Sequence, residues 1–201
     1  MKQLLKKIIL MILALSILNF ANVEAEEKKT LRLVKLPIIF QSVQPDFDTC
    51  ATLETKLARA VHIPLNGTLK LVEYADTSES TNALNEVWRK MRSENKNAKL
   101  KDAIKPLAEK MDADIIVCPL LRRYSEHYFQ HGFNLETHLV SDVSATLIVY
   151  DRRTDELVEK KYSRSWSGGS NRFGKASYLA GECFDKLIQE TKLREKIAEI
   201  R

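Results

Sequence analysis

The sequence predicts an α/β (α+β) fold: a mixed sheet of about five strands with a β-hairpin and a C-terminal amphipathic helix, and with the helices packed on the sheet. The main observation is hydrophobic periodicity, which changes between strand and helix spacing in the order β-α-β-α-α-β-β-β-α. The second is composition, with 44% hydrophobic and 29% charged residues and only 6 Gly and 5 Pro. These values exclude a collagen-like chain, a disordered tail and a disulfide-packed miniprotein.

The first 25 residues resemble a secretory signal peptide. Three lysines lie before or at the start of an apolar run over Ile8–Leu18, and small residues follow up to Ala25. The alternative is a membrane anchor, but this run has 11 residues and a transmembrane helix needs roughly 20. We therefore predict cleavage after Ala25, a single α/β domain over residues 26–201, no transmembrane segment in the mature chain, and a periplasmic or secreted location.

The first half of the mature chain is expected to form strand, helix and strand. Leu31–Phe40 is the first strand, in which Pro37 requires a bulge or an edge position because proline cannot donate to a ladder. Thr49–His62 carries an apolar stripe at helical spacing and ends before Pro64. Thr68–Tyr74 alternates in hydrophobicity and is the second strand.

Two helices and a strand follow. Ser80–Arg92 and Ala98–Met111 both have one apolar face, and Pro106 is expected to kink the second helix or to mark a late start. Asp114–Tyr124 is rich in Ile, Val and Leu and is the third strand.

The C-terminal third contains the clearest elements. His138–Tyr150 is the fourth strand and is expected to be central in the sheet, because both of its faces carry residues that pack well. Glu156–Trp166 completes a hairpin with it, and two adjacent lysines indicate an edge or solvent-facing position. A loop over Ser167–Gly174 leads to the last long helix, Lys175–Thr191. The tail from Leu193 has few apolar positions, and its deletion is expected to be tolerated.

Three segments resemble extracytoplasmic α/β domains of bacterial envelope proteins, such as the N-terminal domain of TolB and the periplasmic domain of the curli secretion channel. They are Leu36–Ile39 (LPII), Asp112–Val117 (DADIIV) and Val143–Arg152 (VSATLIVYDR). The resemblance covers most of residues 30–190. This sequence departs from the pattern of such domains at Cys118-Pro119, where they often have glycine. The resemblance implies the fold and the compartment, and it carries over no catalytic residue.

The chain has three cysteines, Cys50, Cys118 and Cys183, and no Cys-x-x-Cys motif. The first interpretation is that all three are small buried hydrophobic residues. The alternative is a disulfide between Cys50 and Cys183, which requires their two helices to pack side by side.

The candidate binding site is the segment 124–138, predicted to be a long loop between two strands. It is richer in aromatic and histidine residues than the rest of the chain, and large rings with polar edges are typical of binding surfaces. The candidate ligand- or partner-binding residues are Tyr124, His127, Tyr128, Phe129, His131 and Phe133. The alternative is that the two strands extend through this segment and the rings complete the core.

The histidines allow a second interpretation of the same segment. His127 and His131 are four residues apart, so one helical turn would place both on one face, as metal sites require. No third ligand has a defined spacing, and the motif H-E-x-x-H is absent. We therefore predict no metal site and no cofactor.

The sequence contains no catalytic motif and has a formal net charge of only +5, of which the first 25 residues carry +2. We therefore expect an exported, soluble bacterial envelope protein that is not an enzyme, a binding or assembly module whose partner is a protein or another envelope component. Nucleic-acid binding is not expected, because no basic face is concentrated enough. The alternative is an exported hydrolase or metal-binding protein that uses the histidine-rich loop.

Overall fold

The computed structural model describes residues 30–131 and 136–198, so the expected signal peptide lies outside the described residues. Within them, six strands form one mixed sheet in the order β3-β1-β4-β5-β6, and β2 also pairs with β4. The strands are β1 (Leu31–Lys35), β2 (Ile39–Phe40), β3 (Val72–Tyr74), β4 (Ile115–His131), β5 (Glu136–Asp151) and β6 (Glu156–Gly169). The N-terminal strands pair in parallel, whereas β4, β5 and β6 form an antiparallel meander. The predicted mixed α/β fold is confirmed.

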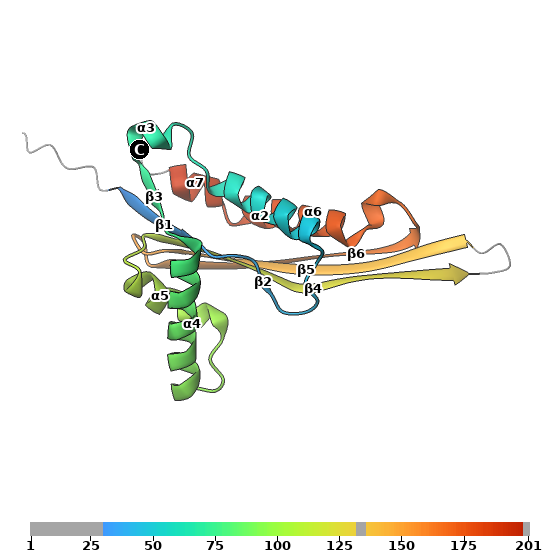
Figure 1. The fold of residues 1–201 in the computed structure, drawn as a ribbon, viewed down its shortest axis with the longest axis horizontal. Coiled ribbons are helices and arrows are strands. Elements are labelled where there is room, and N and C mark those ends of the chain that lie inside the picture. The colour runs from blue at the N-terminus through green and yellow to red at the C-terminus, as the bar shows by residue number, and fades with distance from the viewer. Residues whose placement is uncertain (1–29, 132–135, 199–201) are drawn as a thin grey trace, which may run out of the picture.

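Helices cover both faces of the sheet (Figure 1). One face carries α2 (Phe47–Val61), α6 (Ala176–Glu190) and α7 (Leu193–Ala198), and the other carries α4 (Thr77–Glu94) and α5 (Ile104–Lys110). Shorter turns are α3 (Asn66–Leu69), η1 (Leu100–Ala103) and η2 (Arg172–Gly174). In the described part, no helix is long and apolar enough to cross a membrane.

The predicted first strand is divided into β1 and β2, and two prolines explain the division. Pro37 lies between the two strands, where no ladder bond is needed. On β4, the pairing with β1 ends at Val117 and the pairing with β2 begins at Leu120, so Pro119 lies opposite the same gap. The expectation of one continuous strand was therefore wrong, and the break lets β4 contain a proline although it has neighbours on both sides.

The predicted second strand is shorter than expected because an asparagine side chain replaces part of it. Asn66 Nδ2 donates to the carbonyl of Val72, and the Val72 amide donates to Asn66 Oδ1, each at 2.7 Å. This side chain pairs with the backbone as a strand would. The preceding residues therefore form the turn α3, and only Val72–Tyr74 joins the sheet.

A β-bulge in β4 changes which side chains face each helical layer. The pairing shifts by one residue between Leu121, opposite Ala145, and Arg123, opposite Ser144. The extra residue shifts the alternation of faces by one position, so that both Leu121 and Tyr124 face the layer of α2 and α6. The ring of Tyr124 therefore continues the core on that side of the sheet.

Strand β5 lies between β4 and β6, which confirms that the predicted fourth strand is central. Every residue from Val143 to Asp151 is buried. Residues such as Leu147 face the α2 and α6 layer, and Ile148 faces the α4 and α5 layer.

The C-terminal tail is part of the core. Leu193 and Ile197 of α7 are both buried against the α2 and α6 layer, so the expectation that the tail is dispensable was wrong. The sequence pattern underestimated it because two apolar positions suffice when a six-residue helix is held by polar contacts.

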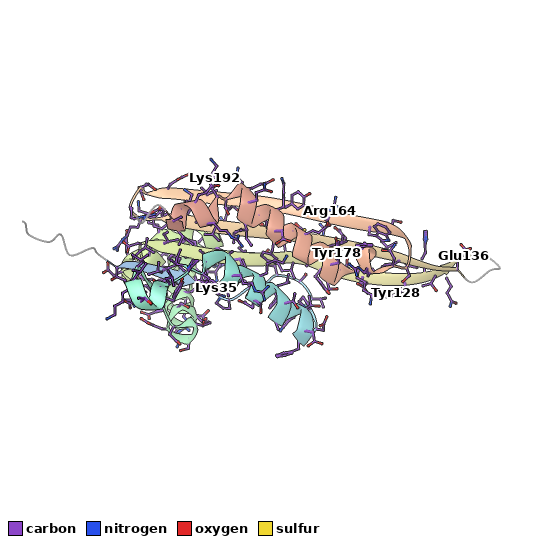
Figure 2. The ribbon with its side chains drawn as sticks, turned by 90° about the horizontal axis from the view of Figure 1, so that it is seen from above. Lys35, Tyr128, Glu136, Arg164, Tyr178 and Lys192 are labelled. Atoms are coloured by element: carbon purple, nitrogen blue, oxygen red, sulfur yellow. The ribbon has the colours of Figure 1, made fainter. Side chains whose placement is uncertain are left out.

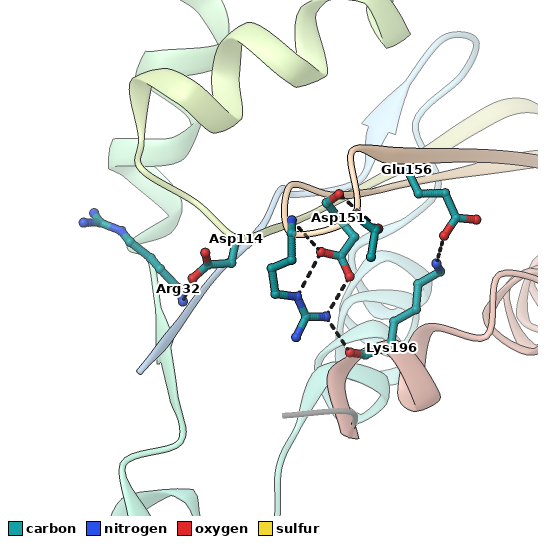
Figure 3. Close-up of polar contacts among 7 residues, drawn as sticks. Arg32, Asp114, Asp151, Glu156 and Lys196 are labelled. Atoms are coloured by element: carbon teal, nitrogen blue, oxygen red, sulfur yellow. Dashed lines mark hydrogen bonds and ion pairs between the residues drawn. The ribbon is translucent and has the colours of Figure 1, made fainter. Parts of the chain in front are cut away.

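These polar contacts surround a buried carboxylate at the turn between β5 and β6 (Figure 3). Arg153 donates to both carboxylate oxygens of Asp151, Nε to Oδ1 at 2.9 Å and Nη2 to Oδ2 at 2.6 Å. Arg153 Nη2 also donates to the carbonyl of Lys196 in α7 at 3.0 Å, and Lys196 forms an ion pair with Glu156. Burial alone would raise the pKa of Asp151, but the contacts with Arg153 outweigh it and hold that pKa below its ordinary value.

We predict that Asp151→Asn lowers the free energy of unfolding at neutral pH by roughly 2 kcal/mol, because it removes hydrogen bonds to a charged group at a buried site. Because the folded-state pKa is depressed, this contribution is complete above the unfolded-state pKa of about 4 and is lost as the pH falls below it. The difference between wild type and variant in urea unfolding should therefore shrink below about pH 4.

The matched control for this prediction is Asp185→Asn, which breaks an exposed ion pair with Lys56. Its effect should stay below about 1 kcal/mol. Equal effects of the two substitutions would show that the Asp151 contact does not anchor α7.

Candidate functional site

The segment predicted as a loop is a continuation of the sheet. Strand β4 runs to His131, β5 begins at Glu136, and their residues pair one by one from Tyr124 opposite Val143 to His131 opposite Glu136. The loop prediction was therefore wrong, and the alternative of extended strands holds. Figure 1 shows this ribbon continuing past the ends of the helices that cover the rest of the sheet.

The side chains of the ribbon divide between two faces. Tyr124, Glu126 and Tyr128 point to the side of α6, since the pairing places them opposite Val143, Ser141 and Leu139. His127 and Phe129 point to the other side, with ring centroids 6.5 Å apart.

The aromatic rings differ in burial along the ribbon. Tyr124 is partly buried and packs against the core, whereas Tyr128 is 51% and Phe129 is 54% exposed. His127 is also exposed. The described rings beyond Tyr124 therefore do not complete the core.

Two of the predicted residues cannot be placed in the same way. His131 is the last residue of β4, and its side chain lies outside the described part of the chain. Phe133 lies outside the described residues altogether.

Glu126 joins the ribbon to the start of α6. Its Oε2 accepts a hydrogen bond from the Ala176 amide at 2.7 Å, at a helix N-terminus where the N-cap residue Lys175 supplies no side-chain acceptor. Its Oε1 accepts from the Tyr128 hydroxyl at 2.8 Å, and this bond raises the pKa of Tyr128. The sequence did not indicate this role, because the capping carboxylate lies 50 residues before the helix that it caps.

A second pair of exposed rings lies beside that helix start. Phe173 of η2 and Tyr178 of α6 meet edge to face with centroids 5.2 Å apart, and the Arg172 guanidinium lies 4.8 Å from the Phe173 ring centroid. A shallow groove of about 390 Å³ lies between Arg172 and Tyr178 on one side and the first turns of α2 on the other. Tyr178 and Tyr128 lie toward the same end of the molecule in Figure 2. We call these four exposed rings the distal aromatic surface: Tyr128, Phe173 and Tyr178 lie on the α6 side of the ribbon, and Phe129 lies on its opposite face.

The turn η2 is held in place by a tryptophan. A side chain on Gly174 would place its Cβ 2.4 Å from Cδ1 of Trp166, so only glycine fits against the indole ring. This contact fixes the path of the chain from β6 to α6. It thereby positions Phe173 next to the first turn of the helix.

The described residues provide no metal site. No three His, Cys, Asp or Glu side chains within the described ranges are grouped so that they can hold an ion. His127 and His131 lie on a strand and not on a helix, so their Cα atoms are about 13 Å apart at a rise of about 3.3 Å per residue. The four-residue spacing therefore does not form the paired arrangement considered from the sequence.

The cysteines are free thiols in the structure, and the bond considered between Cys50 and Cys183 is not formed. Cys183 lies in the core under α6, whereas the Cys50 thiol donates to the carbonyl of Pro45 at 3.5 Å. Burial raises the pKa of both Cys118 and Cys183 to about 12. Neither of these two thiols is therefore ionised at neutral pH, as a nucleophile would need to be.

We predict that Glu126→Ala destabilises the protein by about 1 kcal/mol, because the N-terminal amides of α6 lose their acceptor. Hydrogen exchange at the Ala176 amide should increase more than exchange at amides in the middle of α6. Glu126→Gln is the matched control, because its amide oxygen can still accept from Ala176. Unchanged exchange at Ala176 in the alanine variant would contradict this role of Glu126.

Comparison with known proteins assigns no family: no family model matches the chain, and no curated protein matches it. Among solved structures, hypothetical protein CT253 from Chlamydia trachomatis is 12% identical, with a TM-score of 0.43, over 85% of this chain and 99% of its own. A PelC dodecamer from Paraburkholderia phytofirmans is 13% identical, with a TM-score of 0.37, over 79% and 86%. Lipoprotein GNA1162 from Neisseria meningitidis is 16% identical, with a TM-score of 0.36, over 81% and 98%. At these scores the matches assign no function, and the resemblance to TolB and the curli channel stays a prediction.

Proposed function

We propose that this chain is a non-enzymatic binding or assembly module that acts outside the bacterial cytoplasm and captures a protein partner through the distal aromatic surface. The observation that carries the proposal is the exposure of Tyr128 and Phe129 on a part of the sheet that extends past its helices. The signal peptide predicted from the sequence supports the location.

The chemistry of the surface suits protein recognition. Tyrosine and phenylalanine bring large apolar area at a small cost in side-chain entropy, and aromatic residues together with arginine are enriched in interfaces. Arg172 beside Phe173 adds a cation at the rim of the surface. A partner that covers these rings would remove apolar area from water at about 25 cal/mol per Å².

The support beneath the rings favours binding without rearrangement. The Tyr128 hydroxyl donates a hydrogen bond to Glu126, and Glu126 accepts another from the first residue of α6. The Tyr128 side chain is therefore connected to α6 as well as to its own strand β4. Strand β5 pairs with β4 on one side and with β6 on the other as far as His138. A site on rigid elements loses little conformational entropy when it binds.

We predict that Tyr128→Ala combined with Phe129→Ala lowers partner affinity at least tenfold, because hot-spot rings typically contribute about 2 kcal/mol or more. The partner is first isolated from native envelope extract with the wild-type chain, and its affinity for each purified variant is then measured by calorimetry. The free energy of unfolding should change by less than about 1 kcal/mol, since both rings are more than half exposed.

The matched control is Leu65→Ala combined with Leu69→Ala. These side chains are 73% and 56% exposed, and they belong to the α3 region, which lies far from the ribbon tip in Figure 1. The control should bind like wild type. If it loses the same affinity, or if the ribbon variant unfolds, the distal aromatic surface is not the binding site.

A further inference from the structure

The outer edge of β6 is a long and regular strand edge. All 14 residues of β6 pair with β5, from Glu156 opposite Asp151 to Gly169 opposite His138, without a bulge. β6 is the last strand in the sheet order, and no backbone hydrogen bond from another described segment reaches its outer side. The strand contains no proline. Of the common ways to protect an edge, this one has two adjacent lysines, whereas a bulge, a proline and a covering described segment are not found on it.

The hydrogen-bonding pattern of the β5–β6 ladder identifies which backbone amides and carbonyls of β6 point away from β5. The Ser170 amide donates to the carbonyl of Thr137, which makes that pair a hydrogen-bonded pair of the ladder. Such pairs alternate with pairs whose amides and carbonyls point away from the partner strand. The outward-pointing residues of β6 are therefore Leu157, Glu159, Lys161, Ser163, Ser165, Ser167 and Gly169.

The middle of this edge carries uncompensated positive charge. Within the described residues, Lys160 and Lys161 are exposed and form no ion pair. The neighbouring charged residues of β6 are in ion pairs, Glu159 with Lys101 and Arg122, and Arg164 with Glu182.

The two lysines lie on different faces of the sheet. Lys160 pairs with Leu147 of the α6 side, whereas Lys161 pairs with Thr146 of the opposite side. A strand added to this edge would therefore meet one cation on each face, at two adjacent positions.

The geometry points to an extended segment of a partner protein, with two adjacent acidic residues, that adds to the outer edge of β6 as a further strand. Backbone hydrogen bonds to the outward groups would supply affinity, and the acidic pair opposite Lys160 and Lys161 would set the register. Next to the lysines, the short side chains of Ser163, Ser165 and Ser167 leave room for large side chains on the added strand. This surface is separate from the distal aromatic surface, and the inference does not depend on the proposed function.

A second copy of this chain fits the edge less well than an acidic segment does. Antiparallel pairing of two β6 strands must place outward-pointing residues opposite each other. A register centred on Tyr162 then places Lys160 opposite Arg164 of the other copy, and one centred on Lys161 places Lys161 opposite Lys161. Parallel pairing shifted by one residue places Lys160 of one copy opposite Lys161 of the other. Like charges on directly opposite residues destabilise a strand pair. The lysines therefore disfavour self-pairing and favour a negatively charged strand.

The charge requirement is tested with two labelled synthetic peptides and the complete chain. One peptide has alternating Thr and Val around a central Glu-Glu pair, and the other has Lys-Lys at the centre. Fluorescence anisotropy should show binding of the Glu-Glu peptide at least tenfold tighter than that of the Lys-Lys peptide. Lys160→Glu combined with Lys161→Glu should reverse this preference. An unchanged preference in the charge-reversed variant would overturn the inference.

The strand geometry is tested by blocking the edge with proline. Ser163→Pro removes an outward amide and should abolish binding of the Glu-Glu peptide, whereas Ser163→Ala should keep it. If Ser163→Pro fails to fold, Ser167→Pro applies the same block nearer to the end of the strand. Binding that survives a folded proline variant would overturn the inference.

Two further measurements distinguish peptide binding at the β6 edge from binding at the distal aromatic surface and from self-association. The variant with Tyr128→Ala and Phe129→Ala should bind the Glu-Glu peptide like wild type, and loss of binding would place the peptide on the distal aromatic surface instead. Analytical ultracentrifugation of the wild-type chain should show no dimer that is lost in the Ser163→Pro variant. Such a dimer would mean that a second copy, and not an acidic segment, occupies the edge.

Discussion

Strand β5 has a hydrogen-bonded neighbour on each side along almost its whole length, and the rest of the structure depends on this pairing. Near the turn at Asp151 both faces of β5 are covered by helices, which produces two cores on one sheet. Toward Glu136 the same three strands continue where fewer helices cover them. One continuous ladder therefore builds the core and also holds side chains away from it.

The strands and helices with strong periodicity were predictable from the sequence, and the irregular connections were not. The central strand and the C-terminal helix were predicted because their apolar residues keep one period over many positions. The division between β1 and β2 depends on where Pro37 and Pro119 meet across two strands, and local periodicity does not contain that information. Asn66 was interpreted as a turn residue, although its side chain also pairs with Val72.

The candidate site was predictable in composition but not in form. The concentration of rings around Tyr128 correctly identified an exposed aromatic segment. Many residues separate the two predicted strands on either side of this segment, and this length suggested a loop. Sequence spacing alone does not distinguish a loop from an extended ribbon. Glu126 was missed because its contact joins residues 50 apart, and no local pattern connects a strand carboxylate with a distant helix start. Phe173 was missed although its ring partner Tyr178 is close in sequence, because the segment before α6 was interpreted as a plain loop.

The bulge between Leu121 and Arg123 determines how the ribbon can change in length. It sets the face on which each ring lies, and every further residue on a strand reverses that face. Beyond the bulge, an insertion of one residue in each strand would keep the pairing but exchange the faces of Tyr128 and Phe129. Only insertions or deletions of two residues per strand preserve both pairing and orientation. The reach of the ribbon tip can therefore vary only in steps of about 7 Å, the rise of two residues in an antiparallel strand.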